Sequence, residues 1–180
     1  MSWDIFVLDF PRDTTTVEDV PEGFSPASLG KRSTIISRIE EVVPTANFSN
    51  LSWGLIDGDG WSIEVNIGDS EDCKGFVFHV RGGDEAVGVV AAVLQHLDLR
   101  AFDAQTGDFF VAGQEAVESF RKWRAYRDRV VADLGRDPAV PPSTGSGSGP
   151  LSKLRSRFLA WASKWPSGRP SKKESRPTGP

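Results

Sequence analysis

An acid, a histidine and an arginine on two neighbouring alternating runs are the residues best suited to chemistry. Glu64 lies in the run 61–67, and His79 and Arg81 lie in the run 76–81. If the two runs pair as antiparallel strands, Glu64 and His79 face each other on the polar side. A carboxylate beside a histidine favours the protonated imidazole and can orient it as a base. The three residues are therefore candidate catalytic residues, and a solvated cross-strand charge pair is the plainer interpretation.

Other catalytic and metal-binding signals are weak. Cys73 lies in an acidic loop that disfavours its thiolate, and the sequence contains no Gly-x-Ser-x-Gly motif. The two histidines, His79 and His96, have no spacing typical of a zinc site. The segment 57–60 reads Asp-Gly-Asp-Gly, which predicts a hairpin turn better than a calcium loop because the later ligands are missing. We expect no metal and no cofactor.

Two further segments could meet anions. Residues 81–83 read Arg-Gly-Gly before a helix, but full phosphate-binding patterns are absent, so a tight turn with Asp84 as N-cap is favoured. A secondary basic patch on a predicted helix could bind phosphates or an acidic partner; it consists of Arg121, Lys122, Arg124 and Arg127. A solvated helix face is the plainer interpretation, and the acidic body opposes nucleic acid.

Hydrophobic periodicity predicts the elements that position these residues. The N-terminal strand has large apolar side chains on both faces, which predicts cover on both sides. The expected elements are a strand at 3–9, a helix at 34–43 capped by Ser33, three alternating runs at 51–55, 61–67 and 76–81, a helix from Asp84 to Leu97, strand pieces at 99–103 and 109–111, and a helix at 114–134. The last helix has an apolar stripe of Val117, Phe120, Trp123, Val130, Val131 and Leu134. This order predicts an α+β fold in which an antiparallel three-stranded meander and the N-terminal strand pack with two to three helices.

The alternation also predicts the register of the meander, because a slip of one residue turns every apolar side chain to the wrong face. The expected pairs are Ile63 with Val80, Val65 with Phe78, Ile67 with Phe76, Leu55 with Ile63, and Trp53 with Val65. On the polar face, this register puts Gly54 in one row with Glu64 and His79. A glycine there leaves room for a ligand.

Composition bounds the class of protein. The chain has 180 residues, a net charge of −4 and 38% hydrophobic residues, which argues against a fully disordered, collagen-like or membrane-embedded chain. One cysteine and an N-terminus without a basic signal-peptide region predict a cytoplasmic protein. The expected parts are an acidic domain at 1–136, a Pro/Gly/Ser linker at 137–150, a basic amphipathic helix at 151–165 and a disordered basic tail at 166–180.

The C-terminal helix is the strongest functional signal. Residues 151–180 hold eight basic residues and one acid, a net +7, whereas residues 1–150 hold 13 basic and 24 acidic residues, a net −11. The candidate partner- or membrane-binding residues are Leu151, Lys153, Leu154, Arg155, Arg157, Phe158, Trp161, Lys164 and Trp165. Because a helix of this length is marginal in water, it needs a surface on which to fold. An anionic membrane, a protein groove and its own acidic domain remain open.

Three short motifs carry a resemblance. They are Met-Ser-Trp-Asp-Ile-Phe-Val at the start, Trp-Gly-(x)2-Asp-Gly-Asp-Gly at 53–60 and Phe-His-Val-Arg-Gly-Gly at 78–83. Over residues 1–134 the chain resembles a family of small uncharacterised bacterial proteins. The resemblance implies a bacterial cytoplasmic origin and no particular chemistry.

The sequence therefore favours a non-enzymatic protein-interaction module, for example an immunity-type or accessory protein whose acidic face meets a basic partner. Its basic tail would tether it to an anionic membrane surface at the inner face of the membrane, or to a partner. The alternative is a small hydrolase-like enzyme that uses Glu64, His79 and Arg81. The identity of the partner protein, the substrate and the oligomeric state stay open.

Overall fold

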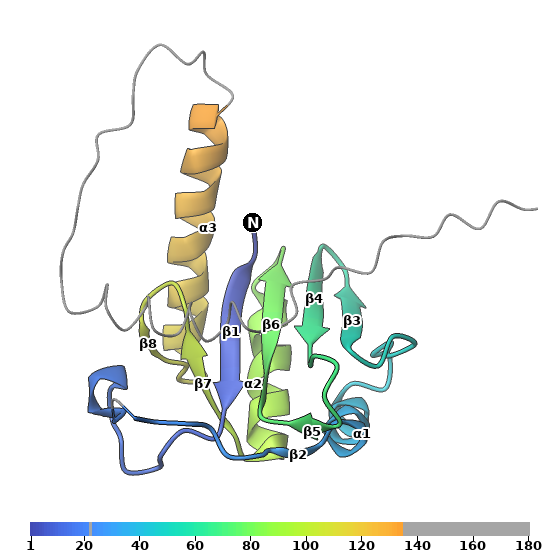
Figure 1. The fold of residues 1–180 in the computed structure, drawn as a ribbon. Helices are drawn as coiled ribbons and strands as arrows, with labels where there is room; N and C mark the ends of the chain where they lie inside the picture. The colour runs from blue at the N-terminus through green and yellow to red at the C-terminus, as the bar shows by residue number, and fades with distance from the viewer. Residues whose placement is uncertain (22, 135–180) are drawn as a thin grey trace, which may run out of the picture.

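The computed structural model describes residues 1–21 and 23–134, which form an α+β fold around one antiparallel sheet (Figure 1). Six strands run in the order β3-β4-β6-β1-β7-β8. Their bounds are β1 Trp3–Leu8, β3 Trp53–Gly58, β4 Trp61–Asn66, β6 Gly75–Arg81, β7 Arg100–Asp103 and β8 Asp108–Phe109. The α+β prediction is confirmed, and the sheet is wider than the predicted meander.

Strand β1 lies in the middle of the sheet, between β6 and β7. It pairs antiparallel with both, with Ile5 opposite Phe78 on one side and opposite Asp103 on the other. Its apolar side chains are buried on both faces, as its sequence predicts: Ile5 and Val7 join one hydrophobic cluster, and Phe6 joins another.

The β3–β4 hairpin corrects the predicted register by one residue. Ile56, not Leu55, lies opposite Ile63, and Leu55 lies opposite Glu64. The reason is the turn: Gly58 pairs with Trp61, so Asp59 and Gly60 form a two-residue loop, and loop length fixes the register of a hairpin. The predicted β4–β6 pairs of Ile63 with Val80 and Val65 with Phe78 are confirmed.

Gly54 consequently points to the other face of the sheet from Glu64 and His79. A Cβ atom built on Gly54 would lie 2.2 Å from the Phe48 ring, so the missing side chain makes room for a core phenylalanine. The prediction that Gly54 leaves room for a ligand beside His79 is therefore wrong.

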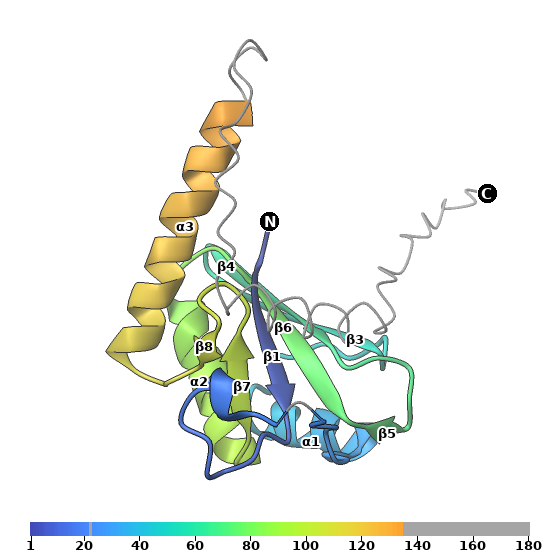
Figure 2. The ribbon, with the colours of Figure 1, turned by 60° about the vertical axis from the view of Figure 1, so that its left-hand side comes forward.

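Three helices pack on one face of the sheet, here called the inner face, and form the main core with it (Figures 1 and 2). Helix α1, Arg32–Val42, buries Ile35, Ile36 and Ile39 there. The predicted Ser33 cap is wrong because the helix begins two residues earlier than expected: Lys31 is the N-cap, and its side chain makes no capping hydrogen bond. The extended backbone of β2, Gly30–Lys31, which pairs with β5, Asp72–Cys73, runs directly into the helix.

Helix α2, Glu85–Leu97, is rich in apolar residues and buries many of them in the main core, as predicted. Asp84 occupies the N-cap position but makes no side-chain capping hydrogen bond. Its carboxylate instead accepts hydrogen bonds from arginines of α3. The turn before it depends on Gly82, whose φ is +93°; a Cβ atom there would lie 2.1 Å from the carbonyl oxygen of Gly60.

The outer face of the sheet, opposite the helices, is covered in part by the N-terminal loop. Phe10, Val20 and Phe24 from that loop cluster with apolar side chains of β1, β6 and β7, namely Phe6, Leu8, Val77 and Phe102. A short 3₁₀ turn, η1 at Val17–Asp19, lies within the loop. The outer face therefore has an apolar half centred on β1 and β7 and a polar half toward β3 and β4.

Helix α3, Gln114–Leu134, extends well beyond the sheet (Figures 1 and 2). Its first half buries Phe120 and Trp123 in the main core. The predicted apolar stripe does not continue into the core, since Val131 is 56% exposed. The sheet is too short to cover the second half of a 21-residue helix. Among the described residues, no helix is long and apolar enough to cross a membrane.

Candidate functional site

The candidate catalytic residues lie in one cross-strand row on the outer face. Asp4 of β1 pairs with His79 of β6, His79 with Glu64 of β4, and Glu64 with Leu55 of β3. Arg81 lies two residues after His79 on the same face, because side chains alternate along a strand. The sheet thus brings together all three residues predicted from the sequence and adds Asp4.

Asp4, not Glu64, is the carboxylate that binds His79. The His79 Nδ1 atom lies 2.8 Å from Asp4 Oδ1, and the same oxygen accepts a hydrogen bond of 2.7 Å from the Ser2 hydroxyl. Because a carboxylate only accepts, Nδ1 carries the proton of this contact. In the neutral imidazole, Nε2 is then the acceptor.

Glu64 binds Arg81 instead of the histidine. Arg81 Nη1 donates to Glu64 Oε1 at 2.6 Å, and Nη2 reaches Oε2 at 3.4 Å. The side chains are 29% and 19% exposed, so the pair is partly screened by water. The predicted Glu64–His79 pair is therefore replaced by two separate pairs, His79 with Asp4 and Arg81 with Glu64.

Trp53 completes the surface around His79. Its ring stacks on the imidazole with centroids 5.5 Å apart and planes inclined by 17°. The corrected β3 register makes this contact possible, since it puts Trp53 and Leu55 on the outer face. Sequence reasoning missed both Trp53 and Asp4. Asp4 had a signal that could have found it, because it is the one polar residue in the apolar strand Trp3–Leu8.

The order of these contacts does not match a nucleophilic catalytic site. In a serine hydrolase the hydroxyl binds the imidazole and the carboxylate binds the far side of the ring. Here the Ser2 hydroxyl and the imidazole both bind one oxygen of Asp4, so the histidine is not placed to take the proton of Ser2. The arrangement can bind and orient polar groups, and it can hold His79 in one tautomer.

Cys73 and His96 lie outside the candidate site and form hydrogen bonds within the fold. Cys73 is 2% exposed, and its thiol donates to the Gly75 carbonyl oxygen at 3.3 Å. Burial, followed by the nearby Asp72 charge, raises the pKa of the Cys73 thiol, which agrees with the expectation of a poor thiolate. His96 Nε2 lies 2.8 Å from Glu41 Oε2 and joins the end of α2 to α1.

Three of the four arginines and lysines in the secondary basic patch form ion pairs. Arg121 Nε and Arg124 Nη1 donate to the two oxygens of Asp84 at 2.7 and 3.0 Å. Arg127 pairs with Asp128, its neighbour in the chain. The hydrogen bond from Arg121 is the main cause that lowers the pKa of Asp84. Through Arg121 and Arg124, the patch joins α3 to the start of α2, a tertiary contact that neither interpretation of the sequence included.

The described residues contain no group of three or more metal-ligating side chains suited to a metal ion. The segment 57–60 forms the end of β3 and the hairpin turn, as predicted. The linker, the amphipathic helix and its candidate residues from Leu151 to Trp165 lie outside the described residues. Comparison with family profiles, curated proteins and solved structures finds no match for this chain.

Proposed function

We propose that this protein is a non-enzymatic interaction module whose basic C-terminal segment tethers it to an anionic membrane surface. The observation that carries the proposal is the segregation of charge, with a net −11 in residues 1–150 and +7 in residues 151–180. Each cation near an anionic membrane contributes about 1 kcal/mol, and tryptophans add apolar burial at the interface. An acidic domain is repelled by the same surface, so the attachment is confined to the tail.

The direction of α3 supports the tether. At about 1.5 Å per residue, this helix of 21 residues spans about 30 Å, and its C-terminal end lies far from the sheet (Figures 1 and 2). The linker and the amphipathic segment follow that end directly in the sequence. A tail attached there can reach a charged surface while the acidic domain stays away from it.

The pairing on the outer face supports a binding role over a hydrolytic one. His79 and Arg81 each engage a carboxylate, and Trp53 and Leu55 give the same face an apolar part. A mixed aromatic and charged surface of this kind is typical of protein interfaces. In our proposal this face binds the protein partner, and an immunity-type partner would be a basic protein that the acidic domain attracts.

Flotation with liposomes tests the tether. The full chain should float with vesicles that contain phosphatidylserine at low salt and should remain in solution with neutral phosphatidylcholine vesicles. A chain that ends at Val140 should not float with either. A double change of Lys153 and Arg157 to glutamine should reduce flotation more than the matched change of Lys172 and Lys173, which removes the same charge outside the predicted helix.

Two results would contradict this proposal. If the full chain and the shortened chain both stay in the soluble fraction at low salt, the tether does not exist. If wild type shows hydrolase activity in a broad substrate panel and His79→Ala abolishes it, the protein is an enzyme and the outer face is its active site.

A further inference from the structure

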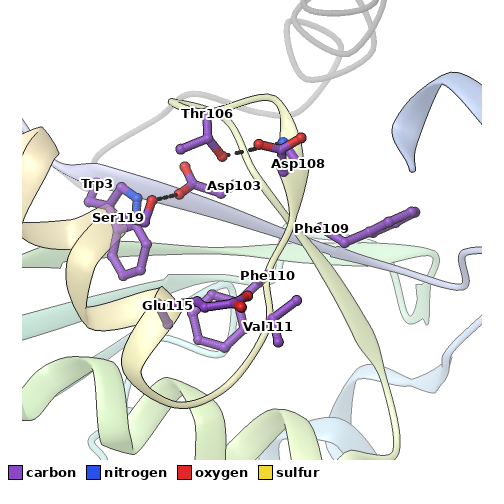
Figure 3. A pocket seen from close by; sticks show the side chains of 10 residues that line it. Trp3, Asp103, Thr106, Asp108, Phe109, Phe110, Val111, Glu115 and Ser119 are labelled. Atoms are coloured by element: carbon purple, nitrogen blue, oxygen red, sulfur yellow. Dashed lines mark hydrogen bonds between the residues drawn. The ribbon is translucent and has the colours of Figure 1, made fainter. Parts of the chain in front are cut away.

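A pocket separate from the outer face lies between the β7–β8 hairpin and the first turns of α3 (Figure 3). Its volume is about 130 Å³, and its polar lining comes from Trp3, Asp103, Thr106, Asp108, Glu115 and Ser119. Phe110 and Val111 line its apolar side, while the ring of Phe109 points away from it. The volume corresponds to a ligand of a few non-hydrogen atoms.

Asp103 is a buried carboxylate whose described partners are all neutral. It is 3% exposed and accepts hydrogen bonds from the Ser119 hydroxyl at 2.6 Å and from the Gln105 backbone N–H at 2.8 Å. No ion pair of Asp103 occurs within the described chain. A buried charge without an opposite charge is costly, so this end of the pocket favours a cation.

Exposed carboxylates at the edge of the pocket increase its preference for a cation. Asp108 and Glu115 are both exposed at the edge of the pocket and add negative charge to its entrance. Carboxylates around a concave site raise the local concentration of small cations.

Trp3 adds a hydrogen-bond donor to the lining of the same pocket. Its side chain is completely buried, and its indole Nε1–H has no hydrogen-bond acceptor among the described residues. A buried donor left without a partner costs about 1–3 kcal/mol, so a ligand atom that accepts from it is favoured. Ser119 and Asp103 lie beside Trp3 in Figure 3.

The spacing of the donor and the carboxylate limits the size of the ligand. Asp103 pairs with Ile5, and Trp3 lies two residues before Ile5 on the same face of β1. Trp3 and Asp103 are therefore diagonal neighbours on adjacent antiparallel strands, a separation of about 7–8 Å and somewhat less between their Cβ atoms. One small molecule can reach both groups.

We infer that this pocket binds a primary ammonium ion that carries a neutral hydrogen-bond acceptor close to the nitrogen. The ammonium donates to Asp103, and the acceptor takes the Trp3 N–H. Two sources provide this chemistry: a free small amine, such as an amino amide or amino alcohol, and the N-terminus of a peptide, whose first carbonyl is the acceptor. The inference does not depend on the proposed tether.

Titration of the full chain with glycinamide tests the inference by calorimetry and by the NMR signals of the indole N–H groups. Glycinamide should bind and shift the Trp3 signal, which Trp3→Phe identifies. Acetamide, which lacks the ammonium, should give no binding. Ethylamine, which lacks the acceptor, should bind several-fold more weakly. Because Asp103→Asn removes only the charge, it should weaken glycinamide binding about tenfold or more, whereas Glu118→Gln, on the exposed side of α3, should leave it unchanged.

Triglycine distinguishes the two sources. Binding at least as tight as that of glycinamide assigns the pocket to a peptide N-terminus, and N-acetylation should then abolish it. Weaker binding of triglycine assigns the pocket to a free amine. Both results support the chemistry.

The inference is wrong if glycinamide fails to bind at millimolar concentration, or if acetamide shifts the Trp3 signal equally. If circular dichroism shows that Asp103→Asn does not fold, Glu115→Gln provides the charge test, because Glu115 is exposed. This variant should weaken glycinamide binding several-fold at low salt. Unchanged binding in a folded charge variant would overturn the inference.

Discussion

The two faces of the sheet differ in what stabilises them. On the inner face, β1, β4 and β6 bury Ile5, Ile63, Val65 and Phe78 completely against three helices. On the outer face, the same strands carry Asp4 and His79, which are joined by a hydrogen bond, and Glu64 and Arg81, which form a partly exposed ion pair. Burial of a large apolar side chain contributes several kcal/mol, whereas an exposed ion pair contributes about 0–1 kcal/mol. The inner face therefore supplies most of the stability of the fold, and residues of the outer face can serve binding at little cost in stability.

The largest expected effect tests this difference directly. Phe78→Ala on the inner face should lower the free energy of unfolding by about 3–5 kcal/mol, because it removes a completely buried ring and leaves a cavity. Leu55→Ala on the outer face should cost less than about 1 kcal/mol, since Leu55 is 37% exposed. Urea unfolding of both variants measures the two values. Equal losses would show that the outer face also contributes to the core.

A pair of glycine substitutions separates a required glycine from a dispensable one. Gly82→Ala should destabilise the protein by about 1–3 kcal/mol, because φ is +93° and the new Cβ would meet the Gly60 carbonyl. Gly88→Ala, in the middle of α2, has nothing within 4 Å of its Cβ and should stabilise by about 0.5–1 kcal/mol. Thermal unfolding monitored by circular dichroism should show shifts of opposite sign. An unchanged or raised melting temperature for Gly82→Ala would refute this account of the turn at Gly82.

The contact between α2 and α3 predicts a pH dependence. The Arg121 hydrogen bond lowers the pKa of Asp84, so Asp84 stabilises the fold above the pKa of an unfolded carboxyl, about 3.9. This contribution is lost as the pH falls through the lower pKa of the folded state. At neutral pH, Asp84→Asn should cost about 0.2–1 kcal/mol, a small effect because water screens the pairs.

The measurement is the difference in urea stability between wild type and Asp84→Asn from pH 7 to pH 3. The difference should shrink below about pH 4. Arg121→Gln should show a similar loss at neutral pH. A constant difference across this range would mean that the Asp84 charge does not stabilise the contact.

The smallest expected effect is the coupling energy between Glu64 and Arg81 on the outer face. A double-mutant cycle with Glu64→Gln and Arg81→Gln should give a coupling energy below about 1 kcal/mol, as for other cross-strand pairs that face water. Urea unfolding of the two single variants and the double variant measures it. A coupling above about 2 kcal/mol would show that the pair is shielded as strongly as a buried ion pair, contrary to the comparison of the two faces.

Hydrophobic periodicity predicted most of the helices and strands, because an element that buries one face repeats its apolar residues at the spacing of that face. The alternation in 61–67 and 76–81 placed Ile63 opposite Val80 and Glu64 on the polar side, and both features are present. The β3 register failed because Leu55 and Ile56 are both apolar, so the pattern there fits either face. The length of the turn at Asp59 and Gly60 decided between them.

The sequence predicted which residues share the candidate site, but it did not predict which of them bind each other. Glu64, His79 and Arg81 share a face, as expected, but adjacency in a row does not determine which side chains hydrogen-bond. Long, flexible side chains can reach diagonal neighbours, and Arg81 takes Glu64 in this way. His79 takes Asp4 from a strand that is 75 residues away in the chain, and no local pattern signals that pairing.

By itself, the sequence determined most of the secondary structure of the domain, the buried faces of β4 and β6, and the separation of an acidic body from a basic tail. These follow from composition and from spacing along the chain, which are local properties. Only the tertiary structure decided that β1 lies at the centre of the sheet, that Asp4 holds His79, and that Trp3 and Asp103 share a pocket. Those contacts join residues far apart in the chain, and they depend on the order and register of strands, which packing of the whole domain sets.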